Sequence, residues 1–138
     1  DVVSVYQKPI YNESYSIGSE IPRVDIIKCY SGADGVLIDA AVSAGARGIV
    51  LEGVGRGQVS PLMVDSIQSA LDKGITVVIS TSAEEGKVYP AYSYNGSAHD
   101  LQTRGVILGE DYDSKKARLK LAILLSNNSV DVSAAFKL

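Results

Sequence analysis

The residues best suited to chemistry lie in one glycine-rich stretch, residues 48–61, which reads GIVLEGVGRGQVSP. Three alternate glycines separate its apolar start from a Ser-Pro pair: Gly53, Gly55 and Gly57. Alternate glycines let a ligand approach the backbone and expose N–H groups that suit a carboxylate or an amide. Gln58 adds a side-chain amide. The stretch therefore predicts a site for a polar small molecule or another chain, and a tight strand-to-helix turn without a ligand is the alternative.

A nucleotide cofactor does not fit this glycine loop. The dinucleotide fingerprint is G-x-G-x-x-G, with an acidic residue after the next strand. Here the glycine spacing is G-x-G-x-G, and the next apolar run leads into Ser80-Thr81-Ser82. The Gly-Lys-Ser/Thr sequence of a P-loop is absent from the chain. We therefore expect no cofactor.

Residue types that hydrolases use in catalysis are present, but they form no recognisable hydrolase motif. His99 and Asp100 are adjacent, but a catalytic triad needs a nucleophile, a base and an orienting acid that the fold brings together. No serine lies in a G-x-S-x-G sequence. His99 as a catalytic base is therefore the weaker hypothesis, and hydrogen bonding within a loop is the stronger one. The sequence alone predicts no self-contained catalytic set.

Paired carboxylates and potential metal ligands also favour structural interpretations. Glu84-Glu85 lies in a polar loop, and Asp111 and Asp113 precede a helix, where acidic residues favour the positive end of the helix dipole. The chain has one cysteine, Cys29, and one histidine, too few for the usual zinc ligands. We expect Cys29 to be a small buried hydrophobe and predict no metal site.

Length and composition indicate one globular domain that binds neither nucleic acid nor membrane. The 138 residues are 46% hydrophobic, but no apolar run is long enough to span a bilayer. The formal charge is -3, and the 13 basic residues are scattered. The chain begins at Asp1 without a signal peptide, so we expect it to start inside a longer protein or after processing. The compartment stays open, with a cytoplasmic location slightly favoured.

Strand-like and helix-like segments alternate from Arg23 onward, after a linker or N-terminal arm at residues 1–22. Apolar runs predict strands at residues 24–30, 48–54, 75–79 and 106–108. Helical periodicity and capping residues predict helices at 36–44, 61–71 and 114–125, with a short helix or tail at 130–138. Ser60 and Ser114 are the expected N-caps. Residues 23–138 therefore predict a three-layer α/β domain, a flavodoxin/Rossmann-like open parallel sheet of about four strands with helices on both faces.

A long stretch between the third and fourth predicted strands, residues 83–104, is rich in Gly, Tyr and Asn. We expect a loop with a possible extended piece at residues 87–92. A loop of this length is uncommon unless it is functional. Its tyrosines predict half-exposed contact surfaces more than deep core: Tyr89, Tyr92 and Tyr94.

Five segments in register resemble the C-terminal domain of bacterial-type L-asparaginases, the asparaginase/glutaminase family. Residues 45–58, GARGIVLEGVGRGQ, resemble the family's "AGYDGIV…GVGNGN" segment. The other four are residues 22–30, 70–82 (ALDKGITVVISTS), 86–96 (GKVYPAYSYNG) and 105–125, which contains Lys116-Ala117-Arg118. The similarity covers roughly residues 20–126. It implies an amidohydrolase that converts L-asparagine, or L-glutamine, to the acid and ammonia.

The resemblance also implies that the catalytic nucleophile and part of the substrate-binding site belong to different domains. In this family the nucleophilic threonines belong to a larger N-terminal domain, so this domain alone is expected to be inactive. The smaller domain completes the active site of a neighbouring subunit in a dimer or tetramer. Gln58, beside Gly57, matches a substrate-binding position, and Asp100 is the candidate for a family glutamate before the last strand. The alternative is a regulatory or assembly module without catalysis.

Overall fold

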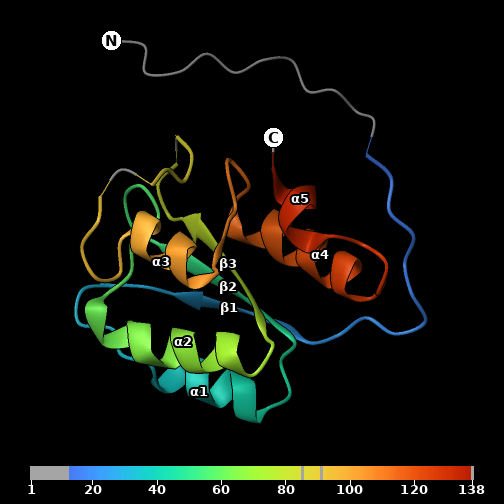
Figure 1. The fold of residues 1–138 in the computed structure, drawn as a ribbon, viewed down its shortest axis with the longest axis horizontal. Helices are drawn as coiled ribbons and strands as arrows, with labels where there is room; N and C mark the ends of the chain where they lie inside the picture. Colours follow the sequence, from blue (N-terminus) through green and yellow to red (C-terminus); the bar gives the residue numbers. More distant parts are fainter. Residues whose placement is uncertain (1–12, 85, 91, 138) are drawn as a thin grey trace.

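A computed structural model describes residues 13–84, 86–90 and 92–137 (Figure 1). The first twelve residues of the predicted N-terminal arm lie outside the described residues, as does Glu85 of the Glu84-Glu85 pair. None of the helices within the described ranges is long and apolar enough to span a membrane.

Four parallel strands form the central sheet in the order β1-β2-β3-β4. Their bounds are β1 Val24–Lys28, β2 Gly48–Gly53, β3 Thr76–Thr81 and β4 Ile107–Leu108. Each strand pairs with the next in sequence, so β1 and β4 lie at opposite edges. The predicted open parallel sheet of about four strands is confirmed. Its carboxyl edge carries the loops that follow each strand.

Helices cover both faces of this sheet, as predicted (Figure 1). One face carries α1 (Val36–Ser43), α2 (Val64–Asp72) and α3 (Ala98–Arg104). The opposite face carries α4 (Ser114–Leu125) and α5 (Val132–Phe136). A single 3-10 turn, Pro61–Met63, leads into α2. The arrangement is the three-layer α/β architecture expected from the alternating pattern.

Alternation along the strands divides the core into two layers. In β2, Ile49 and Leu51 face the α1–α3 layer, while Val50 faces α4. This follows from the two-residue period of a strand, in which successive side chains point to opposite faces. All three side chains are fully buried. The strand that leads into the glycine loop is therefore rigidly held on both faces.

Of the two predicted N-caps, Ser60 caps the 3-10 turn before α2, and Ser114 is not an N-cap. Ser60 Oγ accepts a hydrogen bond from Leu62 N at 3.3 Å, as the Ser-Pro pair predicted. The prediction that Ser114 caps α4 is wrong. Asp113 is the N-cap, and its Oδ1 accepts from Lys116 N at 2.8 Å. Ser114 is the first helical residue, and its hydroxyl instead donates to Glu52 Oε2 at 3.0 Å.

The stretch expected to be a long loop contains a helix, so that prediction needs correction. Ser97 Oγ accepts from Asp100 N at 3.1 Å and begins α3, and Gly105, at a φ of 112°, ends it. The proposed extended piece at 87–92 holds no β-strand among its described residues. Backbone hydrogen bonds from Val88 N and Tyr89 N nevertheless fix its course.

The described part of the N-terminal arm lies across α4. Lys120 Nζ lies 2.8 Å from Glu13 Oε2, and Gly18 N donates to Ser126 Oγ at 2.9 Å. Three rings surround the ammonium, with centroids 4.7 to 5.7 Å from Nζ: Tyr15, Tyr112 and Phe136. The hydrogen bond from Lys120 is the largest cause of a lowered pKa for Glu13. Residues 13–18 are thereby fastened to the domain.

Candidate functional site

The glycine loop closes into a tight turn between Val54 and Gln58. Val54 N donates to Gln58 O and Gln58 N donates to Val54 O, both at 2.9 Å. Gly55 and Gly57 lie in the left-handed region, with φ values of 54° and 98°. Only glycine adopts this conformation without appreciable strain. The alternate glycines therefore shape the turn, and the backbone N–H of Gly57 is used within it, donating to Val54 O at 3.0 Å.

The segment before α3 clamps this turn from outside. Tyr89 N donates to Arg56 O at 3.0 Å, and the Arg56 guanidinium carbon lies 5.7 Å from the centroid of the Tyr89 ring. Val88 packs against Gly57 so closely that a Cβ there would lie 2.6 Å from Val88 Cγ1. The end of β3 adds a third contact, from Thr81 Oγ1 to Gly55 O at 2.6 Å. Backbone and side chains thus hold the turn on two sides.

Gln58 is held by a tyrosine that comes 36 residues later in the chain. The hydroxyl of Tyr94 donates to Gln58 Oε1. The Tyr94 ring lies beside Tyr92, with centroids 5.9 Å apart. Both tyrosines are about half exposed, as the sequence predicted. Sequence patterns indicated a contact surface here, but not which side chain Tyr94 would touch.

An open hollow of about 560 Å³ lies beside this contact. Its lining comprises Pro90, Tyr92, Ser93, Tyr94 and His99. His99 is exposed, and its side chain has no hydrogen-bond partner among the described residues. Its backbone carbonyl accepts from Thr103 Oγ1 at 2.9 Å. Within the described ranges, therefore, no acid orients His99 as a catalytic base requires.

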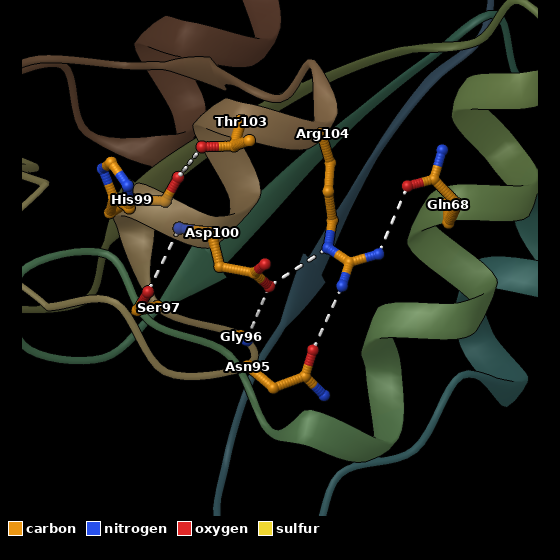
Figure 2. Close-up of polar contacts among 8 residues, drawn as sticks. All are labelled: Gln68, Asn95, Gly96, Ser97, His99, Asp100, Thr103 and Arg104. Atoms are coloured by element: carbon orange, nitrogen blue, oxygen red, sulfur yellow. Dashed lines mark hydrogen bonds and ion pairs between the residues drawn. The ribbon is translucent and has the colours of Figure 1, made fainter.

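Asp100 belongs to a polar network that joins α3 to α2 (Figure 2). Its Oδ2 accepts from Gly96 N at 3.0 Å and from Arg104 Nε at 3.1 Å. Arg104 also donates to Gln68 Oε1 at 3.3 Å and to Asn95 Oδ1 at 3.2 Å. Figure 2 shows the His99 ring on the other side of the helix. The structure therefore does not bring Asp100 into contact with Gln58.

The network also sets the ionisation of Asp100. Partial burial acts to raise the pKa of this carboxyl, but the hydrogen bonds from Gly96 and Arg104 outweigh it and hold the pKa below its ordinary value. A carboxylate with a lowered pKa contributes stability above its unfolded-state pKa of roughly 4 and loses it as the pH falls further.

We expect Asp100→Asn to lower the free energy of unfolding of the chain by about 1 kcal/mol at pH 7, because it removes the charge from two hydrogen bonds. Urea unfolding at pH 7 and pH 3 would measure this, and the difference from the parent should shrink at pH 3. Asp111→Asn is the control, since Asp111 is exposed and makes no side-chain hydrogen bond among the described residues. A difference that stayed the same at both pH values would contradict the proposed charge effect.

The other residues considered from the sequence are three carboxylates and the cysteine. Asp113 caps α4, while Asp111 and Glu84 are exposed. Cys29 is buried, as predicted, and its sulfur accepts from Ser60 N at 3.2 Å. No cluster of three potential metal ligands occurs among the residues that the structure describes.

Comparison with known proteins gives consistent results. Residues 23–135 match the glutaminase/asparaginase C-terminal domain. The chain is 54% identical to an L-asparaginase of Bacillus licheniformis over 136 residues, 99% of this chain and 42% of that protein. It is 37% identical over 119 residues to L-asparaginase 2 of Bacillus subtilis, covering 85% of this chain and 30% of the relative. A subunit of the glutamyl-tRNA(Gln) amidotransferase of Methanopyrus kandleri is 37% identical over 122 residues, 88% of this chain and 26% of the relative.

The family match covers all four strands, the helices α1 to α4 and all but the last residue of α5. It also includes the turn at Gln58 and the segment with Tyr94 that holds it. The chain spans less than half the length of these relatives. Since the match covers the whole sheet and most of the chain, the chain belongs to the glutaminase/asparaginase C-terminal domain family.

Proposed function

We propose that this chain is the C-terminal domain of an L-asparaginase, an amidohydrolase that converts L-asparagine to L-aspartate and ammonia. The domain would help bind the amino acid and build the oligomer. The observation that carries the proposal is the clamped turn that presents Gln58, inside a domain of this family. The names of the two Bacillus relatives support L-asparagine as the substrate.

The proposed roles of the site residues follow from their contacts. Gln58 offers a side-chain amide to the substrate from the end of the turn. Gly57 acts through its shape, because its N–H is already bonded within the turn and its missing side chain admits Val88. Direct contact between Asp100 and the substrate stays a prediction. The carboxylate of Asp100 stabilises the junction between α3 and the preceding loop.

The catalytic nucleophile, in this proposal, comes from another domain. Of the three threonines, two have hydroxyls that donate to backbone carbonyls, Thr81 to Gly55 and Thr103 to His99. Thr76 begins β3 and makes no side-chain hydrogen bond among the described residues. A nucleophilic hydroxyl needs an adjacent activating group, and neither contact supplies one. We therefore assign this domain to substrate binding and expect an asparaginase N-terminal domain to provide the reacting threonine.

Exposed apolar side chains near the carboxyl edge of the sheet support a contact surface for that domain and for further copies in a dimer or tetramer. Tyr30 follows β1 and Val54 follows β2, while Leu62 lies in the turn before α2. These side chains are 43% to 65% exposed in the isolated chain. Large apolar side chains gathered at a surface are typical of protein interfaces.

Ammonia release from L-asparagine tests the proposal in three samples: the full-length protein that contains this chain, its Gln58→Ala variant and the 138-residue chain alone. We expect Gln58→Ala to raise KM about tenfold, equivalent to roughly 1.4 kcal/mol of lost binding. The chain alone should release no ammonia. Gln58→Asn, which keeps the amide but shortens the side chain, should fall between the parent and Gln58→Ala.

Two results would contradict this proposal. Release of ammonia by the chain alone at an enzyme-like rate would show that it carries its own nucleophile. An inactive full-length protein whose chain nevertheless bound L-asparagine through Gln58 would favour the regulatory module instead.

A further inference from the structure

Resting on the proposed function, we propose that Tyr94 is a positioning residue that turns the Gln58 amide so that its N–H donors meet a carboxylate of the substrate. Tyr94 does not itself touch the substrate in this proposal. It acts through the hydrogen bond that its hydroxyl donates to Gln58 Oε1.

The chemistry of a primary amide gives this contact a direction. A glutamine side chain has one acceptor oxygen and one donor NH₂ group. Because Tyr94 already donates to Oε1, Nε2 is the end of the amide whose hydrogen-bonding positions are both left for a ligand. This nitrogen lies over the turn, where a Cβ built on Gly55 would be 3.9 Å from it. Among the described residues, Nε2 has no acceptor. The free donors call for a ligand oxygen rather than a ligand ammonium.

The charge on the turn agrees with that assignment. Arg56 lies two residues before Gln58, and its guanidinium carbon stacks at 5.7 Å over the Tyr89 ring. A cation and a pair of N–H donors on one turn favour an anion, and an amino acid substrate offers its carboxylate. Tyr89 and Tyr94 belong to the same segment. The segment that carries Tyr89 and Tyr94 therefore contacts both the Arg56 guanidinium and the Gln58 amide.

The length of the glutamine side chain explains why it needs support. Gln58 has three rotatable bonds before its amide, and ordering them on binding costs conformational entropy. A hydrogen bond made before the ligand arrives removes part of that cost from the binding step. The Tyr94 ring lies beside that of Tyr92, with centroids 5.9 Å apart, and the Tyr92 hydroxyl takes no part in the contact with Gln58.

Tyr94→Phe in the full-length protein tests this inference, because it removes only the hydroxyl. We expect KM for L-asparagine to rise about fivefold, while kcat stays within about twofold and the melting temperature does not change. Tyr92→Phe is the matched control. It removes a hydroxyl from the neighbouring ring, which has no hydrogen bond among the described residues, and KM should stay at the parent value.

A double-mutant cycle separates this inference from the proposed function. If Tyr94 acts through Gln58, adding Tyr94→Phe to Gln58→Ala should raise KM no further. The same fivefold rise in both backgrounds would overturn the inference, as would an unchanged KM for Tyr94→Phe when Gln58→Ala alone raises KM. An unchanged KM for Gln58→Ala would instead overturn the proposed role of Gln58 and this inference with it.

Discussion

Replacing Gly96 with alanine is expected to lower the free energy of unfolding of the chain by about 3 kcal/mol. Gly96 lies at a φ of 92°, a left-handed conformation that costs a residue with a side chain about 1 kcal/mol. A Cβ at this position would also lie 2.6 Å from the carbonyl oxygen of Val59. Because that oxygen belongs to the backbone, it cannot rotate away as a side chain would. Relief of the clash would add about 2 kcal/mol to the loss.

The same substitution strains a junction that serves the proposed site. Gly96 O accepts from Val59 N at 2.9 Å, and Gly96 N donates to Asp100 at 3.0 Å. Gly96 therefore joins the residue after Gln58 to the start of α3. Urea unfolding would measure the loss in the Gly96→Ala variant.

Gly74→Ala is the control for the conformational part of this effect. Gly74 has a similar φ of 82°, and a Cβ there would meet no atom of the described chain within 4 Å. We expect a loss of about 1 kcal/mol for this variant. Equal losses for the two variants would show that contact with Val59 is unimportant.

Phe136→Ala is expected to lower the free energy of unfolding by about 4 kcal/mol, within the usual range for removing a buried phenylalanine. The side chain is fully buried, and its ring meets Tyr112 edge to face, with centroids 5.8 Å apart. The helix α5 has only five residues, too short to be stable without packing. Its attachment to the domain therefore depends strongly on this one ring.

Phe136→Leu separates volume from aromatic character. Leucine keeps much of the buried apolar surface but not the ring, whose centroid lies 5.3 Å from Lys120 Nζ. We expect this variant to lose about 1.5 kcal/mol. Thermal or urea unfolding of both variants would give the comparison. A loss below about 1 kcal/mol for Phe136→Ala would show that α5 contributes little to the folded domain.

The sequence predicted the sheet and most helices because local signals and long-range packing agree in those segments. The centres of β2 and β3 are continuous apolar runs, residues 49–51 and 77–79, and both are buried on two faces in the structure. Ser60 and Pro61 begin the turn before α2 as their residue types favour. Gly45 and Gly74 end their helices at positive φ.

The helix α3 was not predicted because its apolar signal is weak. Only Ala98 and Leu101 of its seven residues are buried. The signal that could have found it was Ser97 followed three residues later by Asp100, the pattern of a capping box. Ser97 does accept from Asp100 N. Asp100, however, accepts from Gly96 N rather than from Ser97 N, so the box is only half formed.

The site itself depends on contacts that no local pattern reports. Tyr94 reaches Gln58 across 36 residues, and Arg104 reaches Gln68 across the same separation. The family resemblance predicts a substrate-binding role for Gln58, but it could not orient the amide of this side chain. It also placed Asp100 near the site in sequence, whereas the fold of α3 directs that carboxylate to Arg104.

The two edges of the sheet leave little opportunity for a second copy to extend it. An unpaired edge strand is a template for aggregation, and short strands and charged side chains reduce that hazard. At one edge β4 has only two residues. At the other, β1 carries Asp25, whose Oδ2 lies 2.9 Å from Arg23 Nε, and Lys28. Strand addition is therefore disfavoured at both edges. The proposed assembly of copies would then use side-chain surfaces, where it can stop at a closed number of subunits.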